Sequence, residues 1–210
     1  MVNKLRYALK RRLGVKKIKV GHAGTLDPLA TGLLIICTGK ATKRIDEYQG
    51  MPKEYTGTLR LGASTPSYDA ETAPDAEFPT DHLREHDIRA AAARLTGFIE
   101  QLPPMFSAVK VDGQPLYKKA RQGKIIERKP RPVEVMRFEI TAVRLPEVDF
   151  AITCSKGTYI RTLAHDLGAS LQNGAYLTAL RRTAIGAFRV ADAWELDELV
   201  AALEAPAADQ

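Results

Sequence analysis

The chain has 210 residues, a net charge of +6, 45% hydrophobic residues and 27% charged residues. This composition is typical of a globular protein with a sizeable core, which excludes collagen-like, fibrous and disordered classes. The longest apolar run, Leu33–Cys37, is far shorter than the roughly 20 residues of a membrane span. Two cysteines are too few for a disulfide scaffold and no signal peptide is readable, so we expect a cytoplasmic protein without membrane partners.

Hydrophobic spacing predicts the elements of the first half of the chain. Leucines at every fourth position predict a short amphipathic helix over residues 3–13, with Gly14 as its stop. Alternating or continuous apolar residues predict strands at 18–20, 33–38 and 55–61. Residues 21–32 hold three glycines and a proline, which predicts a loop, and the Pro-, Asp- and Ser-rich stretch 63–81 is expected to be a connector.

The second half mixes helices with strands. Helices are expected at residues 87–95, 159–171 and 196–203. Strands are expected at 133–143, 150–154, 175–182 and 188–190. The Pro-, Gly- and Lys-rich stretch 102–123 is expected to project as an arm. Because strands and helices do not alternate regularly, the pattern favours an α+β fold with a mixed or antiparallel sheet.

Charges are segregated along the chain. Residues 1–44 hold eleven basic residues and one acid, and residues 103–137 hold nine basic residues and three acids. Acids gather in residues 63–87 and 194–210. This distribution predicts a cationic face that concentrates polyanions. The alternative is a set of solvated helix faces on a basic protein.

The loop over residues 21–32 presents one carboxylate, Asp27, among many cations. Its glycines permit close backbone approach, and Pro28 fixes the turn that follows the aspartate. Cationic surroundings favour an ionised carboxylate, which a nucleophile requires. On loop chemistry alone, the simpler interpretation is favoured, namely a turn aspartate that hydrogen-bonds its own backbone.

The loop sequence Gly-His-Ala-Gly-Thr-Leu-Asp-Pro-Leu-Ala-Thr-Gly resembles the signature loop of the TruB family, the bacterial tRNA pseudouridine-55 synthases. Further segments resemble the family in the same order, at residues 39–43, 53–55, 61–65, 103–108, 116–117, 120–123, 155–161 and 180–182. The resemblance spans about residues 1–190. It implies a pseudouridine-synthase-like fold, in which a mostly antiparallel sheet is flanked by helices and carries a thumb arm at about residues 103–131.

The resemblance implies a reaction that isomerises the T-loop uridine at position 55 of tRNA, with no cofactor. The family's catalytic aspartate falls on Asp27, as a nucleophile toward the base or the sugar. Its active-site tyrosine falls on Tyr55, which would stack on a flipped base or help remove the C5 proton. Its arginine falls on Arg161, which would hold the aspartate through parallel hydrogen bonds. Without the resemblance, Tyr55 fits a packed strand residue and Arg161 fits a solvent-facing side chain.

Substrate-binding positions also follow from the resemblance. His22 would fill the gap left by the extruded uridine. Tyr159 and Leu180 would line the pocket, and Lys43 would lie near the site or contact a phosphate. In the arm, the cations Lys118, Lys119 and Arg121 would hold the T-stem loop of tRNA. A flexible basic loop without order is the alternative for the arm.

We expect a catalytic domain over residues 1–195 and a C-terminal helix and tail over 196–210. A monomer without an obligatory protein partner is expected. A tRNA-binding folding chaperone of the same fold is the alternative function, since only catalysis needs Asp27. Residues 82–86 fit a zinc-protease pattern, but no convincing third ligand follows, so no metal is expected.

Two departures from the family pattern stand out. The family normally opens with a strand and an Asp-Lys-Pro-x-Gly-x-Thr-Ser turn, whereas this sequence starts inside the helix that follows. We therefore expect an N-terminus that is truncated, either because the start is assigned too late or because the region is missing. A missing strand would leave a sheet edge unpaired. After Trp194 the sequence leaves no room for the RNA-binding PUA module of many relatives, so a short form without that module is expected.

Overall fold

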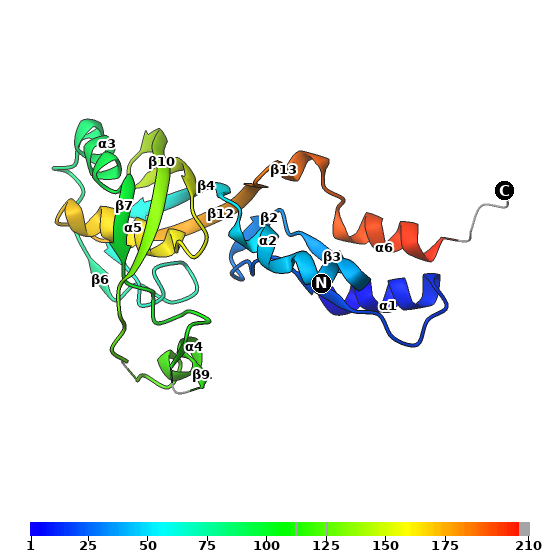
Figure 1. Ribbon diagram of the computed structural model, residues 1–210. Coiled ribbons are helices and arrows are strands. Elements are labelled where there is room, and N and C mark those ends of the chain that lie inside the picture. The colour runs from blue at the N-terminus through cyan, green and yellow to red at the C-terminus, as the bar shows by residue number, and fades with distance from the viewer. Residues whose placement is uncertain (112, 125, 206–210) are drawn as a thin grey trace.

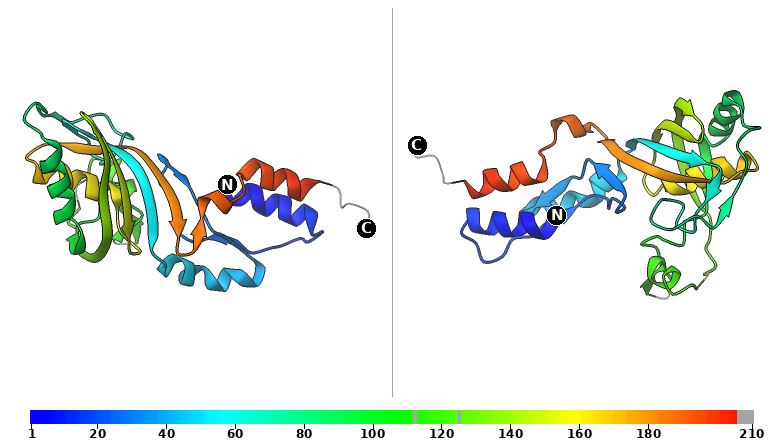
Figure 2. Two further views of the ribbon diagram at one scale, coloured as in Figure 1. Left: turned by 90° about the horizontal axis from the view of Figure 1, so that it is seen from above. Right: turned by 180° about the vertical axis from the view of Figure 1, so that it is seen from behind.

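The computed structural model describes residues 1–111, 113–124 and 126–205 of the chain, which form two lobes (Figures 1 and 2). The larger lobe is built on a seven-stranded sheet in the order β13-β12-β4-β11-β10-β7, with β2 paired to β12. Its strands are β2 (Ala30–Gly32), β4 (Lys53–Leu61), β7 (Gly97–Gln101), β10 (Arg131–Arg144), β11 (Glu147–Cys154), β12 (Ala175–Ile185) and β13 (Phe188–Arg189).

The sheet is mixed and mostly antiparallel, as expected. The pair β2–β12 is parallel, and the other strand pairs described in this sheet are antiparallel. In β11, every second residue is buried, which shows that one face of the strand packs on a core. The α+β fold class is confirmed.

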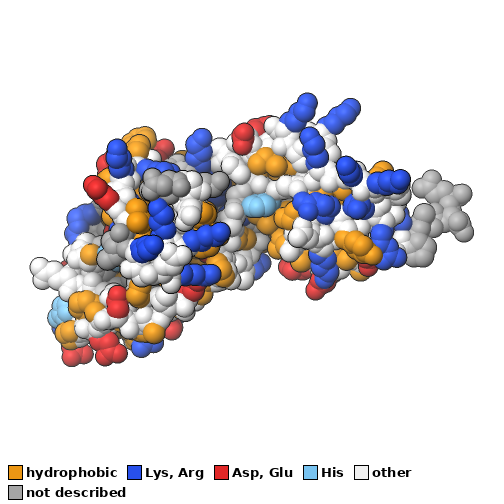
Figure 3. Space-filling model, turned by 90° about the horizontal axis from the view of Figure 1, so that it is seen from below, with side chains coloured by type: hydrophobic (Ala, Val, Ile, Leu, Met, Phe, Trp, Pro, Cys, Tyr) orange, Lys and Arg blue, Asp and Glu red, His pale blue; other side chains and the backbone are white. Residues whose placement is uncertain are grey.

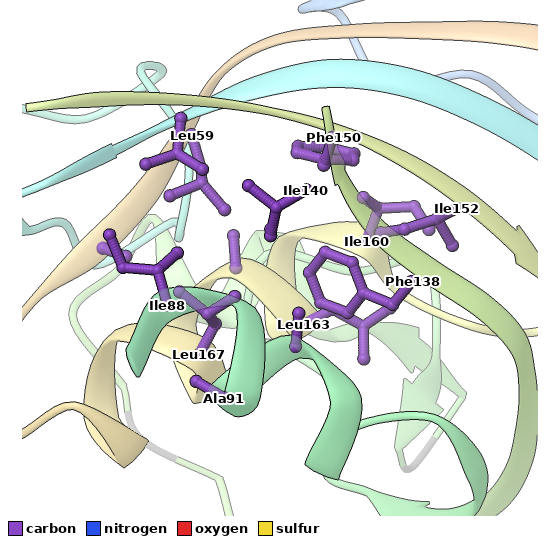
Figure 4. Packing of buried hydrophobic residues seen from close by; sticks show 14 of the residues in the cluster. Leu59, Ile88, Ala91, Phe138, Ile140, Phe150, Ile152, Ile160, Leu163 and Leu167 are labelled. Carbon is purple, nitrogen blue, oxygen red and sulfur yellow. The ribbon is translucent and has the colours of Figure 1, made fainter. Parts of the chain in front are cut away.

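Two helices cover that core face of the sheet. They are α3 (Glu85–Arg94) and α5 (Ile160–Ser170), and both were predicted from their apolar spacing. Ile88 of α3 and Leu163 of α5 pack with Phe138 and Phe150 of the strands in one hydrophobic cluster (Figure 4). This cluster anchors α5, whose first turn faces the functional site.

The smaller lobe is formed by segments from both ends of the chain (Figure 1). It holds α1 (Val2–Arg12), the antiparallel pair β1 (Val20–His22) and β3 (Ile36–Thr38), the 3-10 helix η1 (Gly39–Arg44), α2 (Ile45–Gly50) and α6 (Leu196–Glu204). Helices α1 and α6 lie side by side (Figure 1) around a small apolar cluster of Leu5, Ala8 and Val200. The 3-10 helix η2 (Val190–Asp192) leads from the large lobe to α6.

The segment between β7 and β10 forms the expected arm, which hangs away from the sheet in Figure 1. It contains the short pair β8 (Lys110–Val111) and β9 (Gln114–Pro115) and the helix α4 (Leu116–Ala120). The helix is anchored by Leu116, which is fully buried. Residues 112 and 125 of the predicted arm and residues 206–210 of the predicted tail lie outside the described residues. A further small pair, β5 (Ala63–Ser64) and β6 (Ala76–Glu77), lies in the predicted connector.

Several expectations about single elements were wrong. The predicted strand over 33–38 is a strand only at 36–38, and the predicted loop over 21–32 contains part of β1 and all of β2. The pattern also missed β7, η1 and α2. In β2 the sequence Ala-Thr-Gly has no strand signal of its own, so its extended form depends on pairing with β12.

Among the described residues, no helix is both long enough and apolar enough to cross a bilayer.

We expect Gly32 to be irreplaceable, because it has a φ of +99° and a Cβ there would lie 2.2 Å from the carbonyl oxygen of Arg182. Gly14 also has a positive φ, of +62°, but open space around it. Left-handed strain costs about 1–2 kcal/mol at either position. Gly32→Ala should therefore lower the free energy of unfolding by about 2–4 kcal/mol, and Gly14→Ala by only about 1 kcal/mol. Urea unfolding measures both, and equal losses would contradict the packing of this turn.

Candidate active site

A cleft of about 900 Å³ opens on the helix-covered side of the sheet. Its walls come from the loop between β1 and β2, the N-terminal half of β4, the arm and the turn that precedes α5. One face of β4 carries Lys53 and Tyr55 in the cleft and, further along, Leu59 and Leu61 in the core. The cleft is thus a continuation of the core surface, lined by polar residues instead of apolar ones.

Arg161 lines the cleft from the first turn of α5 and is buried. Its Nε donates to Oδ2 of Asp27 at 2.8 Å. Its two terminal nitrogens donate to the carbonyl oxygens of Ser67 at 3.2 Å and Phe106 at 2.8 Å. Each guanidinium nitrogen therefore has an acceptor, which is what a buried cation requires.

A second carboxylate, Asp69, faces the same guanidinium, with Oδ2 3.6 Å from Nε of Arg161. Its side chain is 2% exposed, whereas that of Asp27 is 41% exposed. The Oδ1 atom of Asp69 accepts from the hydroxyl of Ser67 at 2.6 Å and from the backbone N–H of Glu71 at 2.9 Å. Asp69 is therefore enclosed by donors, while Asp27 is the carboxylate that a bound molecule reaches.

Sequence reasoning missed Asp69. It lies in the acidic connector, where seven acids occur between residues 63 and 87. Nothing in the local pattern separates this aspartate from the other six. Its role as a partner of Arg161 depends on the path of the connector, which the bridge between Asp69 and Leu177 fixes against β12.

A second buried arginine, Arg182, holds the backbone of the Asp27 loop. Arg182 of β12 is 2% exposed, and it donates to the carbonyl oxygens of Leu33 at 2.8 Å and Gly24 at 3.1 Å. Its own backbone carbonyl accepts from the N–H of Leu33 at 2.8 Å. Within the loop, the N–H of Ala30 donates to the carbonyl of Asp27 at 2.9 Å. These bonds make the loop a rigid support for the aspartate.

A β-bulge decides which residues of β12 reach the cleft. The register between β12 and β4 shifts between Leu177 and Ala179. Before the shift the odd-numbered residues are buried, and after it Leu180 and Arg182 are buried while Arg181 is exposed. An extra residue in one strand turns the following side chains to the opposite face. The bulge therefore places Arg182, and not Arg181, under the loop.

Tyr55 lines the cleft, close enough to Arg182 to interact with it. Burial raises the pKa of the Tyr55 hydroxyl, the charge of Asp27 adds to the rise, and Arg182 opposes it. The phenol is therefore protonated at neutral pH, and its ring is a flat neutral surface beside the exposed carboxylate.

The start of α5 is set by a residue from a distant strand. The side-chain oxygen of Gln101, at the end of β7, accepts from the backbone N–H of Tyr159 at 2.7 Å, and its nitrogen donates to the carbonyl of the same residue at 3.1 Å. Both hydrogen bonds hold the residue that precedes α5. The two hydrogen bonds thereby fix the position of the helix start, from which Tyr159 and Arg161 line the cleft.

The structure brings six of the ten predicted site residues into the cleft lining: Asp27, Tyr55, Arg121, Tyr159, Arg161 and Leu180. The other four, His22, Lys43, Lys118 and Lys119, do not line it. His22 is half-buried in β1, and its Nδ1 atom is buried without a hydrogen-bond partner among the described residues. Lys43 is exposed on η1 and Lys118 on α4.

The cleft is lined by more cations than acids. Lys53, Lys156 and Arg131 line it together with Arg121, Arg161 and Arg182, against the acids Asp27 and Glu71. Arg121 pairs with Glu71 at 2.7 Å. Figure 3 shows Lys and Arg side chains gathered on the face that carries the arm. A surface of this kind attracts a polyanion into the cleft.

Lys53 is nearly buried, and its ammonium donates to the backbone carbonyls of Gln49 and Met51. Burial, together with the nearby charges of Arg182 and Lys156, lowers the pKa of Lys53. This side chain joins the end of α2 to the start of β4.

The described residues include no cluster of three or more His, Cys, Asp or Glu side chains arranged to hold a metal ion. His82 and His86 do not share a helix, since α3 begins at Glu85. Cys37 and Cys154 are both free and buried, and burial raises the pKa of Cys154 to about 11. What the cleft offers is an accessible carboxylate oxygen, a flat ring and cations.

We predict that the Tyr55 hydroxyl ionises only above the pH at which a free tyrosine does. Its pKa is raised in the folded state, so the folded protein holds this proton more tightly than the unfolded chain does. The resulting stability is complete below pH of about 10 and is lost as pH rises above that value. Ultraviolet titration of tyrosinate should show one late step that Tyr55→Phe removes. A titration unchanged by Tyr55→Phe would contradict the burial of the hydroxyl.

Comparison with known proteins agrees with this geometry. Residues 10–160 match the family model of the TruB family pseudouridylate synthase (N terminal domain), and residues 161–209 match that of the tRNA pseudouridylate synthase B C-terminal domain. The chain is 55% identical to tRNA pseudouridine synthase B of Flavobacterium johnsoniae over 93% of this chain and 86% of the relative. It is also 55% identical to the Phocaeicola vulgatus protein of that name, over 91% and 82%.

Solved structures with the same fold include the Cbf5-Nop10-Gar1 complex, with a TM-score of 0.67 and 28% identity over 94% of this chain. The archaeal box H/ACA sRNP Nop10-Cbf5 complex has a TM-score of 0.60 and 26% identity over 90% of this chain. The chain spans 49% and 45%, respectively, of those two longer chains. The expected pseudouridine-synthase-like fold is therefore confirmed, and the chain belongs to the TruB family of pseudouridylate synthases.

Proposed function

We propose that this protein converts the T-loop uridine at position 55 of tRNA into pseudouridine, with Asp27 as the nucleophile. The observation that carries the proposal is the hydrogen bond that Arg161 donates to Asp27 in a cationic cleft. The N-glycosidic bond breaks, the uracil turns, a carbon–carbon bond forms from C5, and N1 gains a proton in exchange for the one that C5 loses. The isomerisation exchanges no electrons and consumes no phosphate, so it requires no cofactor.

The geometry suits a positioned nucleophile. Oδ2 of Asp27 is occupied by Arg161, while Oδ1 has no hydrogen-bond partner among the described residues. The fixed guanidinium orients the free oxygen toward the cleft before substrate arrives, which removes part of the entropic cost of the reaction. Attack on the base and attack on the sugar both start from this arrangement.

Tyr55 serves as a stacking surface for the flipped uracil. A base stacked on an aromatic ring gains about 1–3 kcal/mol. Because burial keeps the phenol protonated, the resting enzyme does not offer a phenolate base for the C5 proton. Leu180 and Tyr159 would complete the walls around the base.

The RNA is held outside the pocket by the arm. Lys118, Lys119 and Arg121 would contact phosphates of the T-stem loop, which is recognised mainly by its shape and backbone. Arg121 is held by Glu71 and its guanidinium lies 5.8 Å from the ring centroid of Tyr117, so it is positioned before RNA binds. His22 would occupy the space of the extruded uridine, and Lys43 would contact a phosphate.

We infer that residues 1–195 act as one catalytic unit that includes the arm at about 103–131, and that 196–210 form the C-terminal helix and tail. In support, β12 pairs with β4, so the sheet crosses residue 161, where the second family model begins. We further propose a monomer without an obligatory protein partner. Two free, buried thiols suit the reducing cytoplasm.

A tRNA-binding chaperone of this fold is the alternative function, and no structural feature favours it. It would use the same cations and arm but would not need a carboxylate held by a buried arginine. Asp27 is therefore the residue that separates the two functions.

Asp27→Asn should abolish pseudouridine formation in a T-stem-loop RNA, because the amide is not a nucleophile. The affinity for tRNA should remain within tenfold, or about 1.4 kcal/mol. Mass spectrometry detects the isomer after chemical derivatisation, and filter binding measures the affinity. Asp46→Asn, on the exposed start of α2, is the matched control and should keep full activity. Pseudouridine formation by Asp27→Asn at the wild-type rate would exclude the proposed nucleophile.

A further inference from the structure

The cations of the smaller lobe divide into two groups. One group lies along α1 and is matched by the acidic helix α6. Lys4 pairs with Asp197 at 2.5 Å, and Arg11 lies 3.8 Å from Glu204. These contacts join the two helices. The charges of Lys4 and Arg11 are therefore neutralised by acids of the protein itself.

The second group is unmatched. It includes four exposed lysines outside α1 and α6, which we call the lysine cluster: Lys16, Lys17, Lys19 and Lys40. The exposed Lys43, also unpartnered among the described residues, is already one of the expected substrate-binding residues. Within the described residues, none of the four ammonium groups has a hydrogen-bond or ion-pair partner. Four like charges without a counter-charge repel one another, so the cluster is electrostatically unfavourable until an anion binds.

The fold brings the members of the cluster together. Residues 16–19 lead into β1, and the backbone N–H of Gly39 donates to the carbonyl of Lys19 at 2.9 Å. The segment therefore lies beside the start of η1, which carries Lys40. In a 3-10 helix, residues three apart lie on one edge, so Lys40 and Lys43 extend the same row of positive charge.

The lysine cluster lies outside the catalytic cleft. None of its members lines the cleft. Lys and Arg side chains nevertheless gather over both lobes on the face shown in Figure 3, with the arm on one lobe and the segments around α1 on the other. An RNA that places its loop in the cleft and extends along this face would meet the cluster with its backbone.

We propose that the lysine cluster binds backbone phosphates of a second part of the folded tRNA, next to the T-stem loop that enters the cleft. This inference rests on the proposed function and adds a second RNA contact to it. The arm would hold the stem loop from one side, and the cluster would hold the neighbouring segment from the other. Exposed lysines suit phosphates, which they bind as point charges without sequence preference.

The test compares full-length tRNA with the isolated T-stem loop. The double variant Lys17→Glu/Lys19→Glu should bind full-length tRNA about tenfold more weakly and show a salt dependence smaller by about 1–2 in log–log slope. Its affinity for the T-stem loop, and pseudouridine formation in that RNA, should stay within about twofold of wild type. Reversal of Lys118, Lys119 and Arg121 in the arm should weaken the binding of both RNAs.

Arg60→Glu/Arg94→Glu is the control of equal charge change in the larger lobe, and it should leave the difference between the two RNAs unchanged. Equal losses for both RNAs in Lys17→Glu/Lys19→Glu would overturn the second contact, as would no loss for either. If the wild-type protein forms no pseudouridine in either RNA, the proposed function fails, whereas the binding comparison still decides the role of the cluster.

A second, independent observation concerns residues 67–69, which contact Arg161. Tyr68 has a φ of +63°, a left-handed conformation that is unfavourable for a side chain of this size. Its ring stacks on His165, with ring centroids 4.0 Å apart. His165 lies one turn after Arg161 on α5, and Tyr68 lies between Ser67 and Asp69, both of which face Arg161.

The geometry points to the Tyr68–His165 stack as a positioning contact for the reaction. The stack fastens the Ser67–Asp69 segment to the helix that carries Arg161, so that the guanidinium keeps both its carbonyl and its carboxylate partners. Strained backbone persists only where neighbouring contacts hold it in place. Neither ring lines the cleft, so the effect on the reaction runs through Arg161. This inference also rests on the proposed function.

His165→Ala should lower kcat about tenfold and leave KM within about twofold, because only the catalytic geometry changes. Tyr68→Gly should also lower kcat about tenfold and leave KM within about twofold, since glycine accepts the left-handed backbone but lacks the ring. His165→Phe should restore kcat, and Leu171→Ala, at the residue that follows the same helix, should lower the melting temperature without this kcat effect. Wild-type kcat in Tyr68→Gly, or no rescue by His165→Phe, would overturn the proposal. An inactive wild type would instead refute the proposed function.

Discussion

The arrangement of the site depends on the need of one buried cation, Arg161, for acceptors. A guanidinium out of water is tolerated only when its N–H groups are satisfied. Here the acceptors come from Asp27, Ser67 and Phe106, in the β1–β2 loop, the connector and the start of the arm. One side chain on α5 thereby ties together segments that are far apart in sequence. The position of the exposed carboxylate is a consequence of that demand.

A second buried arginine gives the same loop its stiffness. Arg182 donates to carbonyls on both sides of the Asp27 turn, and its backbone lies against Gly32 so closely that no side chain fits there. One guanidinium therefore binds the carboxylate of Asp27, and the other binds backbone carbonyls of the loop that carries it, at Gly24 and Leu33. Such preorganisation places the oxygen before substrate arrives, which is where much of the rate enhancement of enzymes originates.

The residues proposed to take part in the reaction and the residues proposed to bind the RNA backbone lie in different parts of the molecule. Asp27 and Tyr55, for which we propose roles in the reaction, lie in the cleft, whereas most exposed cations lie on the arm and the smaller lobe. Phosphate contacts contribute binding that depends on salt and hardly on sequence, while the pocket selects the base. This separation explains why substitution of a surface lysine and substitution of Asp27 are expected to change different measured quantities.

The sequence by itself determined the chemical groups of the site and the long elements. The glycine-rich loop marked Asp27, the resemblance to a family marked Tyr55 and Arg161, and apolar periodicity located α3, α5 and the strands β4, β10, β11 and β12 approximately. Only the tertiary structure identified Asp69 among seven similar acids, made a strand of β2 and chose Arg182 over Arg181. Those outcomes depend on a bulge, a parallel pairing and the path of a connector, and contacts of this range leave no periodic pattern in the residues that make them.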